Sequence, residues 1–155
     1  MTTQLNLERI YVKDVSFESP QAPQIFTVPW KPQVKLDLNT TTRSLGDDRF
    51  EVDLRITVTT KTDDELTSMI VEVTQSGIFL VSGFEPDQRK MLLATMCPNI
   101  LFPYIREQID SMMVKGGFPA LHIAPVNFDA VYAQAVQAEA EKAKAEAGQA
   151  TNPPH

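Results

Sequence analysis

The stretch from Phe50 to Thr59, Phe-Glu-Val-Asp-Leu-Arg-Ile-Thr-Val-Thr, decides the fold class of this chain. Its apolar side chains stand at every second position, and a polar residue follows each of them. A period of two sustained over the whole stretch predicts a β-strand with one buried face and one polar face. The fold therefore contains a sheet that rests on a core on one side.

Three further segments predict strands, and their order favours an antiparallel meander. Short polar turns at Thr40–Asp48 and Lys61–Glu65 separate consecutive strands, which is typical of hairpin connections. A proline-rich connector, Pro20–Pro32, follows the first strand. Besides Phe50–Thr59, the expected strands are Leu5–Phe17, Val34–Asn39 and Thr67–Val81, the last one broken near Gly77.

In the first of these strands, the apolar residues do not all fall on one face. Val15 and Phe17 share one face with Tyr11, whereas Ile10 and Val12 fall on the other face. Either both faces of the strand are covered, or a bulge shifts the register.

Behind the strands the apolar period changes to that of a helix. Asp87–Cys97 predicts a short helix that Pro98 ends, and Asn99–Lys115 predicts a longer one that stops at Gly116-Gly117. A last helix begins after Asn127, whose side chain is a preferred cap.

Strands first and helices afterwards define the α+β class. We expect a four-stranded antiparallel sheet with a long proline-broken helix and a shorter C-terminal helix on one face. Residues 1–147 form one domain. The large apolar residues stop after Val136, so we expect a disordered tail over residues 148–155.

Composition excludes several classes of function. The chain has 155 residues and a net charge of −6, with no basic cluster, which argues against a nucleic-acid partner. It has one cysteine, and neither a signal peptide nor a membrane-spanning run is visible. We therefore expect a cytoplasmic protein without direct membrane insertion.

The sequence offers little material for catalysis. Cys97 and His122 could be imagined as a nucleophile and its base, but each is more typical of a structural residue. There is no zinc-ligand spacing, no phosphate-binding glycine loop and no calcium-loop pattern. We therefore expect no enzyme, no catalytic residue, no metal and no cofactor. A small-ligand binding protein remains the alternative from a different class.

Large apolar residues instead occupy the predicted connectors, which normally run over the surface. Such residues either form an interaction surface or simply cap the core. They are Phe26, Trp30, Phe118, Leu121, Ile123 and Val126.

Three long segments of the chain resemble the SecB family of bacterial protein-export chaperones. The first is Arg-Ile-Tyr-Val-Lys-Asp-Val-Ser-Phe-Glu (Arg9–Glu18), followed by Pro20 and Ala22-Pro23. The second is Cys-Pro-Asn-Ile-Leu-Phe-Pro-Tyr-Ile-Arg-Glu (Cys97–Glu107). The third is Gly-Phe-Pro-Ala-Leu-His-Ile-Ala-Pro-Val-Asn-Phe-Asp-Ala (Gly117–Ala130).

This resemblance implies an ATP-independent holdase that binds unfolded precursor proteins in hydrophobic grooves. It also implies a homotetramer, built as a dimer of dimers, that delivers its clients to SecA, the translocation ATPase. Within the family, a general holdase or one linked to a toxin–antitoxin system is the alternative.

The resemblance also assigns roles to residues. The SecA-binding residues would be Asp14, Glu18, Ile70 and Glu72. The client groove would be lined by Trp30, Leu36, Leu38, Phe118, Leu121, Val126, Phe128 and Tyr132. For the oligomer interface our hypothesis is Val71, Val73, Ile105 and Ile109, because the chain has more apolar faces than one four-stranded sheet can cover.

Overall fold

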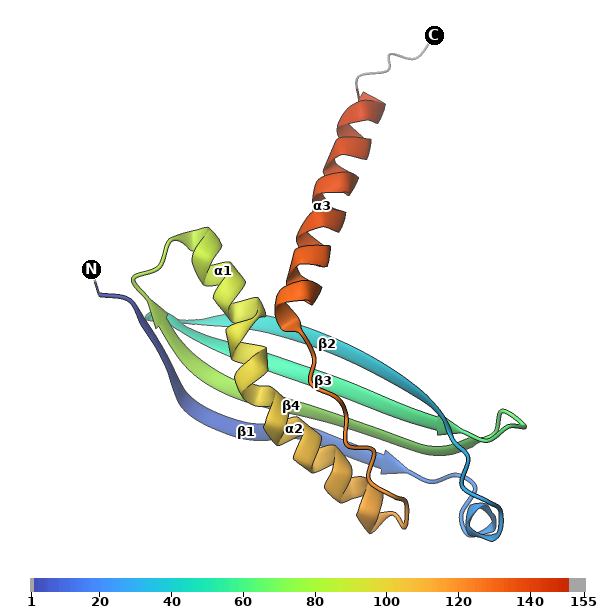
Figure 1. Cartoon of the computed structure of the whole chain (residues 1–155). Helices are drawn as coiled ribbons and strands as arrows, with labels where there is room; N and C mark the ends of the chain where they lie inside the picture. The colour runs from blue at the N-terminus through green and yellow to red at the C-terminus, as the bar shows by residue number, and fades with distance from the viewer. Residues whose placement is uncertain (1, 151–155) are drawn as a thin grey trace.

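The computed structural model describes residues 2–150, with side chains described up to residue 148. One twisted sheet carries helices across one of its faces (Figure 1). The elements in chain order are β1 (Gln4–Glu18), a 3-10 turn (Gln24–Thr27), β2 (Gln33–Gly46), β3 (Arg49–Lys61), β4 (Thr67–Ser82), α1 (Pro86–Ala94), α2 (Met96–Lys115) and α3 (Phe128–Ala150).

The sheet is antiparallel throughout and has the strand order β1-β4-β3-β2. The predicted meander is confirmed for β2, β3 and β4. It is wrong for β1, which pairs with β4 and not with its neighbour in sequence. The proline-rich connector makes this possible, because it carries the chain from the end of β1 to the far edge strand β2 (Figure 1).

The alternation in Phe50–Thr59 is reproduced by β3. Val52, Leu54, Ile56 and Val58 are fully buried beneath the helices, on what we call the helix face of the sheet. Their polar neighbours Asp53, Arg55 and Thr57 lie on the opposite side, which we call the outer face.

Two bulges resolve the parity conflict in the first strand. The register of β1 against β4 shifts between Leu7 and Arg9, and again between Val12 and Asp14. Each bulge adds one residue and so returns the following apolar residues to the helix face. The extra residue at each bulge therefore explains why the apolar side chains of this strand do not alternate strictly in the sequence.

Two of the predicted strand limits were wrong. Strand β2 continues through Thr40–Arg43 to Gly46, so the expected polar turn is mostly strand. Strand β4 runs unbroken through Gly77, which pairs with Ile10 and Val52. Glycine is needed there for space: a Cβ would lie 2.9 Å from the Phe79 ring and 3.1 Å from Leu101 Cδ2.

The long helical segment is bent, but one turn earlier than the sequence predicts. Helix α1 ends at Ala94 and α2 begins at Met96, with non-helical angles at Thr95. Pro98 lies in the first turn of α2, where a missing N–H costs little, so it does not end the preceding helix.

Helix α3 begins as predicted, with the Asn127 side chain accepting the Ala130 backbone N–H at 3.0 Å. The expectation of a shorter helix lying on the sheet is wrong, because α3 is longer than α2 and projects away from the sheet (Figure 1). Residues 148–150, the first of the expected tail, continue this helix. Residues 151–155 lie outside the described residues.

Candidate functional site

The outer face brings the four predicted SecA-binding residues together. Glu18 pairs with Ile70, Ser16 with Glu72, and Asp14 with Thr74, on the adjacent strands β1 and β4. Paired residues in an antiparallel ladder point to the same side of the sheet. Asp14, Glu18, Ile70 and Glu72 therefore share one surface, which we call the acidic patch.

The carboxylates of the acidic patch differ in their partners. Glu72 accepts a hydrogen bond from Thr57 Oγ1 at 2.7 Å and lies 3.8 Å from Arg55 Nε. Among the described residues, Asp14 and Glu18 make no ion pair, and both are exposed. The uncompensated negative charge of the patch therefore lies at the end of β1.

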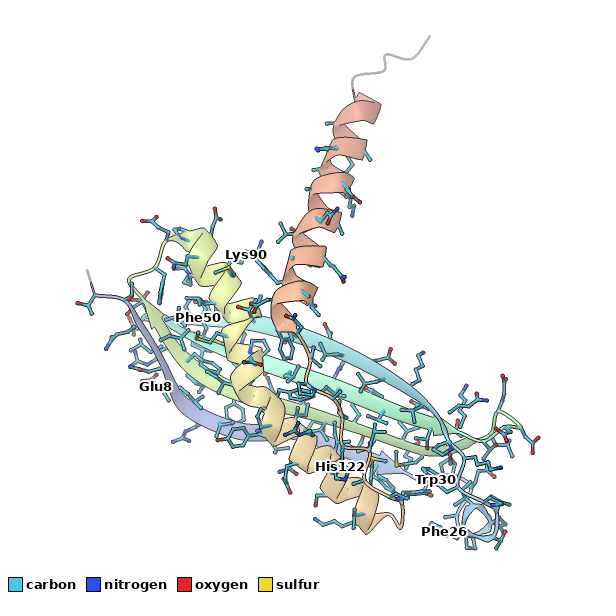
Figure 2. The ribbon with its side chains drawn as sticks, in the orientation of Figure 1. Glu8, Phe26, Trp30, Phe50, Lys90 and His122 are labelled. Atoms are coloured by element: carbon cyan, nitrogen blue, oxygen red, sulfur yellow. The ribbon has the colours of Figure 1, made fainter. Side chains whose placement is uncertain are left out.

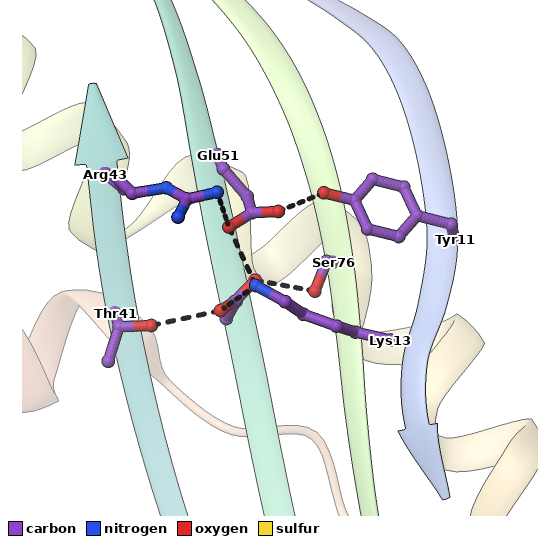
Figure 3. Close-up of polar contacts among 7 residues, drawn as sticks. Tyr11, Lys13, Thr41, Arg43, Glu51 and Ser76 are labelled. Carbon is purple, nitrogen blue, oxygen red and sulfur yellow. Dashed lines mark hydrogen bonds and ion pairs between the residues drawn. The ribbon is translucent and has the colours of Figure 1, made fainter. Parts of the chain in front are cut away.

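A polar network occupies the outer face next to the patch (Figure 3). Tyr11 donates its hydroxyl hydrogen to the nearly buried carboxylate of Glu51. Lys13 Nζ lies 2.9 Å from Glu51 and 3.2 Å from Asp53. Arg43 lies 3.4 Å from Glu51. Lys13 and Arg43 are thus paired with Glu51 and Asp53, and neither of these two cations forms an ion pair with Asp14.

The network shifts the titration of its members. Hydrogen bonds from Tyr11 and Lys13 lower the pKa of Glu51. Burial, followed by the hydrogen bond to Glu51, raises the pKa of Tyr11 to about 12. Hydrogen bonds to Glu51 and Asp53 also raise the pKa of Lys13. All three groups are therefore held in their ordinary charge states across neutral pH.

The second bulge of β1 is fixed from the helix face. Gln75 is buried, and its Nε2 donates to the Tyr11 backbone carbonyl at 3.1 Å. A bulge leaves backbone groups out of the ladder, and a buried carbonyl needs a partner. Gln75 supplies that partner, and the bulge that follows places Asp14 on the outer face.

The helix face carries an aromatic cluster at the end of the connector and of α2. The ring of Phe118 lies 5.1 Å from Trp30, 5.4 Å from Phe26 and 6.4 Å from Phe17, measured between centroids. Such separations are those of favourable aromatic contacts. The cluster joins β1, the connector and the segment after α2.

The eight predicted groove residues do not form one open surface. Phe118 and Phe128 are buried within the chain, and Phe128 packs on Phe102 with centroids 6.3 Å apart. Only Leu36 is clearly exposed, at 39%. The remaining five are half-buried: Trp30, Leu38, Leu121, Val126 and Tyr132.

Several exposed apolar residues near this surface were not among the predicted groove residues, although Phe26 was singled out from the sequence as an apolar connector residue. Trp30, Val28 and Leu66 line a pocket of about 350 Å³ between the connector and the β3–β4 turn. Val34 on β2 is 44% exposed, and Phe26 is 52% exposed. Leu66 directly follows an acidic turn, so only its size and apolarity could have indicated a role.

The predicted oligomer interface corresponds to the core of a single chain. Val71, Val73, Ile105 and Ile109 are all 0% exposed, between the sheet and α2. They offer no surface to a second copy of this fold. These four residues are apolar because α2 packs on the sheet within one chain.

Cys97 and His122 do not form a catalytic pair. Cys97 is fully buried in the core, and burial raises the pKa of its thiol to about 12. His122 is exposed and makes its ion-pair contact with Asp110. In the part of the chain that the structure describes, no three His, Cys, Asp or Glu side chains gather as metal ligands would.

Comparison with known proteins gives these surfaces a context. The family model for "Preprotein translocase subunit SecB" matches residues 1–139. A protein-export protein SecB from Hahella chejuensis is 53% identical over 84% of this chain and 82% of its own. Another from Marinobacter nauticus is 53% identical over 93% of this chain and 87% of its own.

A solved structure agrees in fold. It is a SecB-like chaperone from Mycobacterium tuberculosis in complex with a peptide from an antitoxin. It has a TM-score of 0.66 and 13% identity, and the match covers 79% of this chain and 90% of that one. At this identity the likeness concerns the fold alone.

These matches define a chaperone of protein export, a class that is not enzymatic. Within that class, the chain belongs to the SecB family. Of the helices in residues 2–150, none combines the length and apolarity needed to cross a membrane.

Proposed function

We propose that this chain is a cytoplasmic holdase that captures unfolded precursors on its helix side and docks SecA through the acidic patch. The supporting observation is that one sheet separates two chemically opposite surfaces. Exposed apolar residues such as Val28, Val34 and Leu36 lie on the helix side, and free carboxylates lie on the outer face.

Capture on the helix side follows from the nature of the clients. An unfolded chain exposes many apolar segments, and several weak apolar sites linked on one surface gain avidity for it. Several exposed apolar residues lie there, among them Val28, Val34 and Leu36, and exposed apolar residues that gather on one surface mark interaction sites. Burial of apolar area is insensitive to exact sequence, which suits a broad range of clients.

Docking through the acidic patch follows from its charge. Asp14 and Glu18 lie four residues apart on the same face of β1, or about 13 Å at ~3.3 Å per residue. Ile70 lies opposite Glu18 and supplies an apolar anchor. A basic segment of the motor is the partner that this chemistry fits, and screening weakens such contacts as salt rises.

We propose a homotetramer that uses apolar residues left exposed by the single chain. Leu7, Val12 and Val15 on β1 are 37–39% exposed on the helix face, and Tyr104 and Val114 on α2 are 50% and 59% exposed. Exposed apolar side chains of this size are typical of residues that a second chain covers.

The test of motor docking is a double charge reversal, Asp14→Lys with Glu18→Lys. We expect SecA binding at low ionic strength to weaken about tenfold or more, because wild-type steering is strongest there. Client capture and oligomeric mass should stay unchanged. The matched control reverses Glu139 and Glu141, exposed carboxylates of α3 far from the sheet.

Two results would contradict the assignment of this face. One is unchanged SecA affinity of the double reversal at low salt. The other is a loss of client capture, measured with an unfolded precursor by fluorescence anisotropy.

A further inference from the structure

The segment of residues 119–126, which we call the strap, joins α2 to α3 without regular secondary structure. It passes back along α2, and His122 marks its course in Figure 2. Two of its residues, Pro119 and Pro125, have no backbone N–H to donate. The strap therefore depends on few polar contacts for its position.

Those contacts all come from one carboxylate. Asp110 Oδ1 accepts the backbone N–H of His122 at 3.1 Å, and Oδ2 lies 3.2 Å from His122 Nδ1. Throughout residues 2–150, no other hydrogen bond or ion pair reaches the strap. The side chain of Asp110 is 19% exposed and that of His122 is 81% exposed, so water screens the ion pair as it does at a surface.

The backbone at His122 is itself unusual. Its φ is 54°, in the left-handed region that a residue with a Cβ rarely adopts. Such a conformation persists where the surroundings enforce it. Here it turns the N–H of His122 toward Asp110, so the two features support one another.

The position of the strap decides how much apolar surface is covered. Ile123 on the strap is 6% exposed, and Phe118 just before it is 4% exposed. Trp30 lies against Phe118, half-buried. With the strap in this position, Phe118 and Ile123 are buried in the core and cannot contact another molecule.

We propose that Asp110 is a latch that holds the strap closed over the helix face, and that its release exposes the surface that captures clients. This inference rests on the proposed function, and it makes Asp110 a positioning residue for the capture of clients. A client would then compete with the strap for the same apolar surface. The bond to the backbone N–H is the essential one, so the side chain of residue 122 is secondary.

The test uses four variants of the full chain. Asp110→Ala removes both contacts, and Asp110→Asn keeps an acceptor of similar shape without the charge. His122→Ala removes the ring and keeps the backbone N–H. Glu107→Ala is the matched control, because it removes an exposed carboxylate of the same helix that does not contact the strap.

Opening of the strap can be measured without any client. Trp30 is the one tryptophan of the sequence, so its emission and acrylamide quenching report on the aromatic cluster. We expect Asp110→Ala to shift the emission to longer wavelength and to speed amide exchange in residues 119–126 about tenfold. His122→Ala and Asp110→Asn should show smaller changes, and Glu107→Ala none.

Binding of an unfolded precursor then tests the role of the latch. Asp110→Ala should bind it several-fold more tightly than the wild type. Unchanged exchange and emission in Asp110→Ala would overturn the latch, and an open strap without tighter binding would overturn its role in capture. A wild type that binds no client refutes the proposed function instead, since strap opening is measured on the free chain.

Discussion

The two faces of the sheet are built from different kinds of contact. On the outer face, hydrogen bonds and ion pairs join Tyr11 and Lys13 of β1 to Glu51 and Asp53 of β3, across the strand β4 that lies between them (Figure 3). On the helix face, a strap without secondary structure is held by the single carboxylate of Asp110. Charge on rigid strands can recognise a partner without rearrangement, whereas the apolar surface beneath a strap becomes available only when the strap moves.

The largest expected effect concerns the helix face of β1. Changing Val12 and Val15 to Glu places two charges on the apolar surface proposed to join the chains. We expect the tetramer to dissociate, because a buried unpaired charge is strongly unfavourable. Light scattering should then give a mass near the single-chain value of 17.3 kDa at micromolar concentration.

Leu45→Glu is the control for this substitution, since Leu45 is 45% exposed near the β2–β3 turn. Its mass should equal that of the wild type. A wild-type chain that is itself monomeric at this concentration would contradict the tetramer.

A smaller effect is expected where α2 rests on the sheet. Leu101→Ala removes a fully buried side chain that packs against Gly77. Large-to-small changes in a core cost about 2–5 kcal/mol, or roughly 5–15 °C in melting temperature for a chain of this size. Thermal unfolding followed by circular dichroism measures the loss.

The same variant sharpens the comparison of the faces. At a temperature where Leu101→Ala is still folded, its SecA binding should match the wild type, because the acidic patch lies on the opposite side of the sheet. A parallel loss of SecA affinity there would show that the two faces are not independent.

The smallest effect concerns alkaline pH and the outer network. Tyr11 has a folded pKa of about 12 against 10.0 for the free side chain. A group with a raised folded pKa contributes stability that is complete below its unfolded pKa and disappears as pH rises through the folded one. This contribution of Tyr11 should therefore decline between pH 10 and about 12.

Tyr11→Phe tests this expectation by urea unfolding across that range. The variant should be less stable than the wild type at pH 8, and the difference should shrink toward pH 12. A constant difference in stability would show that the folded state does not raise the pKa of Tyr11. Lys13, whose pKa is raised by its hydrogen bonds to Glu51 and Asp53, is present in both chains, so the difference in stability between them, and not the total slope, is decisive.

Local patterns predicted much of this fold. The alternation in Phe50–Thr59 gave the correct faces of β3, and Asn127 marked the start of α3. Both features depend on residues close in sequence, so the sequence contains them directly. The extension of β2 through Thr40–Arg43 was missed because polar residues on an edge strand look like those of a turn.

Long-range pairings could not be predicted in this way. Nothing local tells β1 to pair with β4, and the positions of its two bulges depend on that partner. Val71 and Ile105 were assigned to an interface although they are buried within the chain. The sequence shows that their face is apolar, but it does not show whether the same chain or a second chain covers it. The contact of Asp110 with His122 depends on how the chain turns back after α2, which no spacing reveals.

The position of β1 at the edge also has a consequence for the order of folding. Strands β2, β3 and β4 are joined by short turns, so they can pair as soon as they leave the ribosome. Strand β1 is made first but must wait, because its partners lie between Ile70 and Ser82. Closing so long a loop is entropically costly and slow. The segment that carries Asp14 and Glu18 is therefore the last part of the sheet to be completed.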